Sequence, residues 1–123
     1  MSRGAPIKVL IADDHPLVRL GLATMLRSEP DMDVVAMAAD GDEAVREALR
    51  SRPDVILLDV RMPVKDGLTA LGEIKQALPA ARCLMLTASS DPPEVSRATH
   101  LGAAGFLRKD ASIDELLRAI RAV

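Results

Sequence analysis

Aromatic residues are almost absent from this sequence of 123 residues, which has no tryptophan, no tyrosine and a single phenylalanine. The chain therefore lacks the aromatic platforms on which proteins stack single-stranded bases. Charge of one sign is also lacking, because 16 basic and 18 acidic residues are interspersed and give a net charge of −2. No basic block is present to neutralise a phosphate backbone. Direct binding of nucleic acid by this chain is not expected.

Cysteines and long apolar runs are equally scarce. Cys83 is the only cysteine, so no disulfide can form within the chain, and its apolar neighbours predict that it is buried. The longest apolar run, Val34–Ala39, is far shorter than the roughly 20 residues that span a bilayer. The first residues, Met1–Pro6, hold no apolar stretch long enough for a signal peptide. These features favour a cytoplasmic protein that does not contact a membrane.

Short apolar runs alternate five times with segments of helical length. The predicted strands are Ile7–Asp13, Asp33–Ala38, Val55–Asp59, Arg82–Thr87 and Ala104–Leu107, and the predicted helices are Pro16–Ser28, Gly41–Arg50, Leu68–Leu78, Pro93–Leu101 and Ile113–Val123. This alternation is typical of a parallel sheet with helices on both faces. We predict one α/β domain over residues 1–123, a doubly wound (βα)5 three-layer sandwich with the flavodoxin-like strand order 2-1-3-4-5.

Several helix ends have sequence signals. Ser112 and Glu115 match a capping box, in which both side chains satisfy free N–H groups at a helix start. Asp14 is a candidate N-cap for the first helix, with Pro16 in its first turn. Gly102 is placed like the glycine that follows a helix. The fourth helix has only a thin apolar stripe, which predicts low local stability.

Four of the five predicted strands end in residues able to do polar chemistry. These residues are Asp13, Asp14, Asp59, Thr87 and Lys109. Parallel strands bring such ends to one edge of the sheet, which is where open α/β sheets bind ligands. The exception is the second strand, which ends in alanines and is an outer strand in the predicted order. The coincidence favours a shared site.

Three carboxylates at one edge have an electrostatic cost. Two of them about 5 Å apart, at an effective dielectric near 20, repel by roughly 3 kcal/mol. The cluster must therefore hold protons or a divalent cation. Because only oxygen ligands are on offer, the predicted metal is Mg²⁺, with Mn²⁺ able to replace it.

Asp59 follows the most hydrophobic strand and is the rigid position best suited to a nucleophile, since a carboxylate can attack phosphorus to give an acyl phosphate. Asp13 and Asp14 would then bind the metal, while Lys109 and Thr87 would bind phosphoryl oxygens. Taken singly, each residue has a structural explanation as a helix cap, a solvated charge or a strand end. Together they favour function.

Particular motifs carry a family resemblance. They are Asp13-Asp14, Asp59 with Pro63 and Gly67 four and eight residues later, Thr87-Ala88, and Gly105–Lys109. Over essentially its full length the chain resembles the receiver domains of two-component response regulators. The stretches Asp13–Pro16 and Lys109–Ser112 resemble the NarL/FixJ subfamily, whose full-length members usually carry a LuxR-type helix-turn-helix domain.

The resemblance implies a chemistry for the site. Asp59 would be the phosphoacceptor, which receives a phosphoryl group from a phosphohistidine on a sensor histidine kinase. Mg²⁺ would be held by Asp13, Asp14 or both, with Asp59 and the backbone carbonyl of Arg61. Lys109 and Thr87 would complete the catalytic set. Such a domain is not an enzyme in the ordinary sense, since it catalyses only its own phosphotransfer and dephosphorylation.

The resemblance also implies a switch. Thr87 would turn toward the phosphoryl group, and Phe106 would rotate inward behind it. The face formed by the fourth helix, fifth strand and fifth helix would then be remodelled. Pro63, Gly67 and Ala88 would shape the loops around the pocket. A phosphorylation-dependent homodimer is one expected partnership.

The chain departs from the commonest receiver pattern at two positions, and Arg61 lies at a position where receivers vary. Lys109 is followed by Asp110 rather than proline, so the bond between them should be trans. Phe106 has no hydroxyl, so its inward state would rest on packing alone. The Arg61 side chain would either lie over the pocket and slow acyl phosphate hydrolysis or be an ordinary solvated charge, which we favour. His15 is interpreted as structural, and His100 as exposed and inert.

Rival functions are less well supported. An aspartate-nucleophile phosphatase usually has two aspartates one residue apart after the first strand, whereas Asp13 and Asp14 are adjacent. A flavin module would need a Ser/Thr/Gly-rich phosphate cradle, and no nucleotide-binding glycine motif occurs. A receiver that acts alone by protein contact is a further alternative. Because the sequence stops at Val123, we hypothesise that it is part of a longer regulator, which would bind DNA only through a C-terminal domain.

Overall fold

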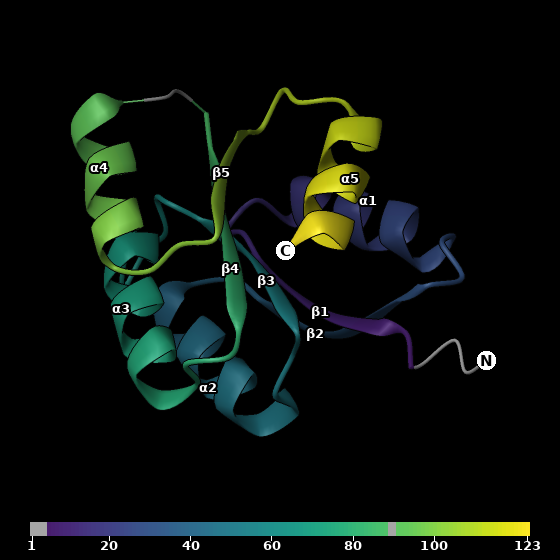
Figure 1. The fold of residues 1–123 in the computed structure, drawn as a ribbon, viewed down its shortest axis with the longest axis horizontal. Helices are drawn as coiled ribbons and strands as arrows, with labels where there is room; N and C mark the ends of the chain where they lie inside the picture. The colour runs from purple at the N-terminus through teal and green to yellow at the C-terminus, as the bar shows by residue number, and fades with distance from the viewer. Residues whose placement is uncertain (1–4, 89–90) are drawn as a thin grey trace.

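A computed structural model describes residues 5–88 and 91–123 (Figure 1). Its five strands are β1 (Ile7–Ala12), β2 (Met32–Ala38), β3 (Val55–Asp59), β4 (Arg82–Thr87) and β5 (Gly105–Arg108). Its five helices are α1 (Pro16–Arg27), α2 (Gly41–Ser51), α3 (Gly67–Ala77), α4 (Pro92–His100) and α5 (Ile113–Ala122). All strands pair in parallel, in the order β2-β1-β3-β4-β5. The predicted fold and strand order are confirmed.

Helices cover both faces of the sheet, with α1 and α5 on one face and α2, α3 and α4 on the other (Figure 1). Successive strand residues point to opposite faces, so neighbouring positions enter different halves of the core. In β3, Val55 and Leu57 pack with α1 and α5, whereas Ile56 and Leu58 pack with α2 and α3. Burial on both faces explains why this strand is apolar throughout.

Cys83 in β4 is fully buried, as predicted, and burial raises the pKa of its thiol to about 11. It therefore behaves as a core hydrophobe. No helix among the described residues has the length and apolar character needed to cross a bilayer.

The helix ends confirm most of the capping signals. Both halves of the Ser112–Glu115 capping box are formed, and Gly102 has the positive φ, 101°, expected of a glycine after a helix. Peptide bonds are trans throughout the described residues, including Lys109–Asp110. The Asp14 prediction was wrong, because His15 is the N-cap of α1 and makes no side-chain capping bond. Asp14 instead points an oxygen to within 3.2 Å of the His15 ring.

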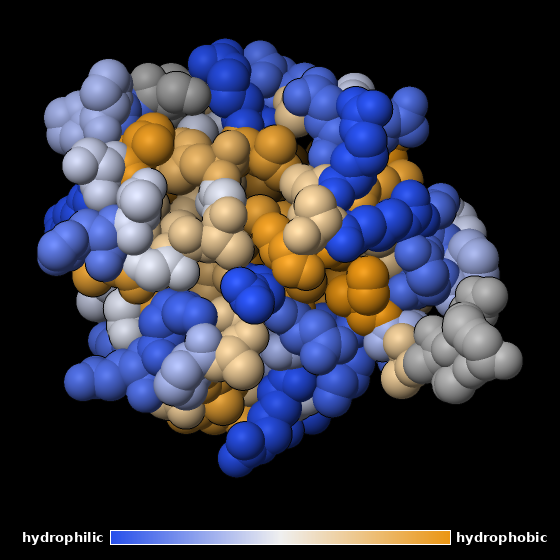
Figure 2. All heavy atoms as spheres, viewed as in Figure 1, coloured by the Kyte–Doolittle hydropathy of each residue, from blue (hydrophilic) through white to orange (hydrophobic). Residues whose placement is uncertain are grey.

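Helix α4 is the least anchored helix of the fold. Ala98 is its one buried residue, which agrees with the thin apolar stripe in the sequence. It flanks β5, an edge strand whose side chains are only partly buried. In Figure 2, apolar surface gathers over the middle of this side of the molecule, where β4 and β5 run between helices, with hydrophilic residues around it. Low stability of α4 stays a prediction.

Gly67 lets α3 begin directly against the end of β3. Its N–H donates to the Val60 carbonyl at 2.8 Å, and a Cβ at this position would lie 1.9 Å from the Asp59 carbonyl oxygen. The loop before it makes a tight turn, in which the Lys65 N–H donates to Pro63 O and Val64 has φ 70°. A β-branched residue rarely adopts that conformation, so the loop following Asp59 is strained.

We predict that Gly67→Ala lowers the free energy of unfolding by about 2 kcal/mol or more, since the added methyl would overlap backbone atoms. Gly21→Ala is the matched control, because a Cβ there meets nothing within 4 Å and Gly21 lies inside α1. It should stabilise the protein by about 0.5–1 kcal/mol. Urea denaturation of both variants measures the effects. Equal stability of Gly67→Ala and the wild type would show that the close approach is not enforced.

Candidate functional site

The carboxyl ends of four strands meet at one edge of the sheet, as the sequence predicts. Ala12 of β1 pairs with Leu58 of β3. Asp13 and Asp59 are the next residues after this pair, so they lie side by side where the two strands end. Thr87 ends β4 beside Arg108 of β5, and Lys109 follows directly. Adjacent parallel strands therefore deliver two carboxylates, one hydroxyl and one ammonium to the same edge.

The Lys109 ammonium lies at the centre of this group. Its Nζ is 2.9 Å from Asp59 Oδ2 and 3.0 Å from Asp13 Oδ2. The Lys109 side chain is 18% exposed, and both carboxylates are almost completely buried. The backbone N–H of Lys109 donates to the Thr87 carbonyl at 2.7 Å, which fixes where the side chain leaves β5.

The turn between β1 and α1 holds the acidic pair. The His15 backbone N–H donates to Asp13 Oδ1 at 2.9 Å, and the His15 ring Nδ1 lies 2.9 Å from the same oxygen. Arg19 donates to the Asp13 carbonyl at 2.6 Å, which ties the turn to the first helix. The turn thus aims the Asp13 carboxylate at Lys109.

Asp59 is held from its other side by its own loop. The Arg61 N–H donates to Asp59 Oδ1 at 3.2 Å, and the Val60 N–H donates to the Leu86 carbonyl at 2.9 Å. The backbone of Arg61 therefore lies next to the Asp59 carboxylate.

The two buried carboxyls differ in their acid–base behaviour. Burial raises the pKa of Asp59, and the charge of Asp13 adds to that rise, while Lys109 opposes it and the net shift is upward. Burial also acts to raise the pKa of Asp13, but the His15 N–H, Lys109 and the His15 ring outweigh it, so this pKa is lowered. Burial lowers the pKa of Lys109, yet contacts with Asp59 and Asp13 reverse the sign and raise it. Lys109 is accordingly a fixed positive charge.

The carboxylate oxygens fit a metal ion. Among the described residues, Asp14 Oδ1 is buried and accepts no hydrogen bond, and Asp13 Oδ2 has its ion pair with the Lys109 ammonium but no well-formed hydrogen bond. Ligand atoms of Asp13, Asp14, His15 and Asp59 all lie within 4.8 Å of one another. Buried anionic oxygens without donors are costly unless a cation joins them. The donor set is thus suited to a divalent cation.

The other predicted residues lie around this cluster. Thr87 is 3% exposed at the end of β4. Phe106 is half-buried opposite Met85 and packs against the core beneath α2, α3 and α4. Pro63 and Ala88 are exposed in the two loops that follow β3 and β4.

Two contacts were not foreseen from the sequence. His15, interpreted there as structural, places its ring nitrogen among the carboxylates, and its position directly after the acidic pair was the available signal. Arg61 is 75% exposed, as the favoured alternative expected, but its guanidinium pairs with Glu94 Oε2 at 2.7 Å. This ion pair joins the loop after Asp59 to α4.

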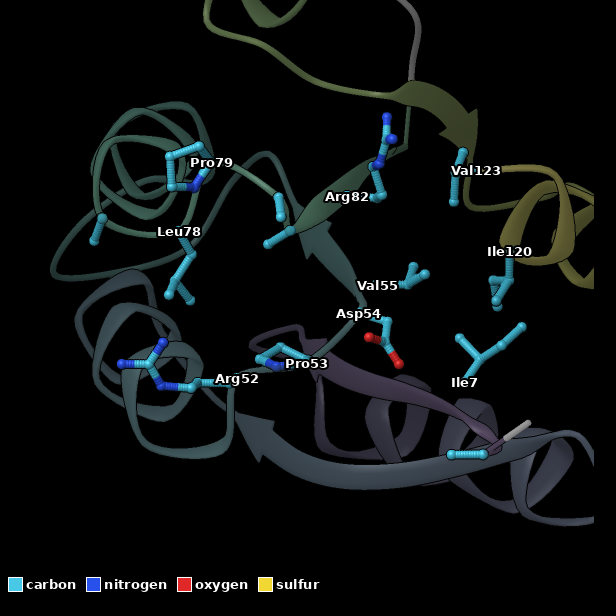
Figure 3. A pocket seen from close by; sticks show the side chains of 14 residues that line it. Ile7, Arg52, Pro53, Asp54, Val55, Leu78, Pro79, Arg82, Ile120 and Val123 are labelled. Atoms are coloured by element: carbon cyan, nitrogen blue, oxygen red, sulfur yellow. The ribbon is translucent and has the colours of Figure 1, made fainter.

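A pocket of about 580 Å³ lies at the opposite, amino edge of the sheet (Figure 3). Arg52, Asp54, Arg82 and Ile120 are among its lining residues. The oxygen Asp54 Oδ2 already accepts a hydrogen bond from the Lys8 N–H at 2.9 Å. Since a single carboxylate lines this pocket, it offers no counterpart to the carboxylate cluster.

Comparisons with known proteins match most of the chain. Residues 9–121 fit the family model described as the response regulator receiver domain. The chain is 40% identical over 117 residues to the transcriptional regulatory protein LnrK of Bacillus subtilis, covering 95% of this chain and 53% of that protein. It is 41% identical over 118 residues to the oxygen regulatory protein NreC of Staphylococcus aureus, covering 95% and 54%. The chain spans about half the length of the curated relatives it matches.

Solved structures agree. The signal receiver domain of the putative response regulator NarL from Mycobacterium tuberculosis superposes with a TM-score of 0.87 at 34% identity, over 98% of this chain and 100% of that chain. The structure of a CheX–CheY–BeF3–Mg²⁺ complex from Borrelia burgdorferi gives a TM-score of 0.90 at 30% identity, over 97% and 90%.

The raised pKa of Asp59 predicts that Asp59→Asn stabilises the metal-free protein at neutral pH. A carboxyl whose folded pKa lies above its unfolded value favours folding while it is protonated, and this contribution is lost as the pH rises through the folded pKa. Urea midpoints measured with EDTA should be higher for the variant at pH 7. The difference should shrink as the pH falls to the ordinary carboxyl pKa of about 3.9.

Asp33→Asn, at an exposed position of β2, controls for the loss of one negative charge and should change little. A lower midpoint for Asp59→Asn than for the wild type at pH 7 would contradict the electrostatic picture of the site.

Proposed function

We propose that this chain, which belongs to the response regulator receiver domain family and to its NarL/FixJ subfamily, accepts a phosphoryl group on Asp59 and switches conformation in response. The observation that carries the proposal is the meeting of the Asp13 and Asp59 carboxylates with the Lys109 ammonium at the carboxyl edge of the sheet. Such a set can bind both the donor phosphate and the charge that develops on transfer.

The proposed cofactor is Mg²⁺, with Mn²⁺ able to replace it. Asp13, Asp14 and Asp59 would supply carboxylate oxygens, and the Arg61 backbone would supply its carbonyl. The buried Asp14 Oδ1, which accepts no hydrogen bond from the described residues, supports this assignment. When bound, the ion neutralises charge on the transferring phosphoryl group.

The protein's own residues would carry out the rest of the transfer. An Asp59 oxygen attacks phosphorus, the phosphorus–nitrogen bond of a donor phosphohistidine breaks, and its electron pair leaves with the imidazole. The Lys109 ammonium lies 2.9 Å from Asp59 Oδ2. Once Asp59 carries the phosphoryl group, the ammonium is placed to bind one of the phosphoryl oxygens. The buried strand end keeps Asp59 rigid. Pro63, Gly67 and Ala88 would shape the pocket mouth.

The proposed switch uses Thr87 and Phe106. Phosphorylation adds a charge of about −1.5 to −2 next to Lys109. The Thr87 hydroxyl would turn to the phosphoryl group, and the hydrogen bond from Lys109 N–H to Thr87 O couples the ends of β4 and β5. Phe106, with no hydroxyl to anchor it, would move inward by packing alone. Helix α4 has little burial to oppose such a movement.

The proposed partner is a sensor histidine kinase, and the proposed compartment is the cytoplasm, where ATP sustains such a kinase. Response regulator receivers are not classical enzymes, and this one would catalyse only its own phosphotransfer and dephosphorylation.

The relatives matched over half their length include a transcriptional regulatory protein. We therefore propose a transcriptional output, through a C-terminal DNA-binding domain beyond residues 1–123 and a phosphorylation-dependent homodimer.

Acetyl phosphate with Mg²⁺ should phosphorylate the wild type, seen as an intact-mass gain of one phosphoryl group that is lost on mild base treatment. Asp59→Asn should gain nothing. Asp54→Asn is the matched control, because Asp54 directly precedes β3 and lines the pocket at the opposite edge of the sheet. It should be phosphorylated like the wild type.

The proposed function fails if the adduct forms equally in Asp59→Asn, or if the wild type gains no adduct while a known receiver domain in the same mixture does.

A further inference from the structure

We propose that the His15 imidazole is a metal ligand in this pocket, which makes it a mixed nitrogen and oxygen site with a preference for divalent transition-metal ions of the Mn²⁺, Co²⁺ and Zn²⁺ class over Mg²⁺. The inference rests on the proposed function only in taking the carboxyl edge of the sheet as the cation site. It concerns a residue of this chain and a selectivity that the carboxylates alone do not provide.

The spacing of the donor atoms supports ligation by His15. Its Nδ1 lies 2.9 Å from Asp13 Oδ1 and 3.2 Å from Asp14 Oδ1. Ligands about 2.1 Å from an ion stand about 3.0 Å apart at right angles and about 3.4 Å apart in a tetrahedron. His15 Nδ1 is therefore already at the separation from each of these two oxygens that a shared ion requires. Asp59 completes a set of four within 4.8 Å.

The pocket shows a second sign that a divalent cation fits it. Asp13 is completely buried, and among residues 5–88 and 91–123 its Oδ2 faces the Lys109 ammonium at 3.0 Å without a well-formed hydrogen bond. Asp14 Oδ1, which lies 3.2 Å from His15 Nδ1, is buried and accepts no hydrogen bond from the described residues. An ion that His15 shares with these oxygens would satisfy both.

The contacts of the ring nitrogen are themselves in conflict. Facing Asp13 Oδ1, His15 Nδ1 would need a proton, whereas facing Lys109 Nζ at 3.3 Å it would need a lone pair. One nitrogen cannot supply both. A divalent cation removes the conflict, because the lone pair and the carboxylate oxygens can all point at it. The side chain is 61% exposed, so burial does not hold the ring in place.

Selectivity follows from the chemistry of the ligands. Mg²⁺ binds oxygen and keeps much of its water, whereas neutral imidazole is a common ligand of borderline transition-metal ions. A nitrogen donor therefore adds affinity for Mn²⁺, Co²⁺ or Zn²⁺ and little for Mg²⁺. The only cysteine, Cys83, is buried in the core, so no thiol competes for these metals.

The chain allows a clean test. His15 makes no side-chain capping bond, and the hydrogen bond to Asp13 from its backbone N–H survives replacement of the side chain. The other histidine, His100, is exposed on α4 and serves as the matched control. His15→Ala and His100→Ala thus each remove one imidazole from the full chain.

The first measurement is Mn²⁺ affinity, from the paramagnetic resonance signal of free Mn²⁺, with Mg²⁺ affinity from competition. The ratio of Mn²⁺ to Mg²⁺ affinity should fall at least about tenfold in His15→Ala, the lower end of the loss seen when even an outer partner of a metal ligand is removed. It should stay unchanged in His100→Ala. An unchanged ratio in His15→Ala overturns the proposal.

The second measurement detects the bond itself. Protein labelled with ¹⁵N in histidine alone should show ¹⁵N modulation of the electron spin echo of bound Mn²⁺, and His15→Ala should lose it. Bound Mn²⁺ without this modulation, or modulation lost in His100→Ala, overturns ligation by His15. Failure of acetyl phosphate with Mg²⁺ to label the wild type would sink only the proposed function, since nitrogen ligation is read without phosphorylation.

Discussion

The contact on which the site depends is the pair of bonds from Lys109 Nζ to Asp13 and Asp59. These two carboxylates belong to neighbouring strands and are almost free of solvent, so without a cation between them their repulsion would oppose the packing of β1 against β3. Lys109 comes from the far end of the chain and supplies that charge. The backbone bond to Thr87 keeps the ammonium in register with β4.

The sheet makes this arrangement precise because its strands cannot slide. Every residue of β3 is buried, and alternate side chains enter the two halves of the core, so a shift of one position would exchange both faces. The close approach of Gly67 then fixes the start of α3 against the strand end. Rigid support beneath the carboxylates contrasts with α4, which contributes one buried alanine.

Much of this architecture could be predicted from the sequence, because apolar runs and strand ends are local patterns. The apolar run of β3 predicted its burial on both faces, and the meeting of Asp13, Asp59 and Lys109 at one edge of the sheet followed from their places at strand ends. What failed depended on side-chain direction. Aspartate is a residue type favoured at N-caps, but the Asp14 carboxylate faces the His15 ring. The N-cap position of α1 is occupied by His15, whose side chain makes no capping bond.

Some contacts between residues far apart in the sequence could not be predicted either. Nothing in the sequence near Arg61 indicates Glu94, since the pairing depends on how the loop after β3 meets the first turn of α4. Nor does the position of Gly67, eight residues after Asp59, reveal that the Asp59 carbonyl lies so close that an added methyl group would overlap it. Such features arise only when helices and loops are placed in three dimensions.

The bond between Arg61 and Glu94 gives α4 a tether whose strength suits reversible motion. Arg61 is two residues from Asp59, and its partner sits in the first turn of the least anchored helix. The Arg61 side chain is 75% exposed, and ion pairs of so exposed a cation contribute about 1 kcal/mol, close to thermal energy. The states with the Arg61–Glu94 ion pair formed and broken therefore differ little in free energy, and small changes in ionic strength would shift the equilibrium between them.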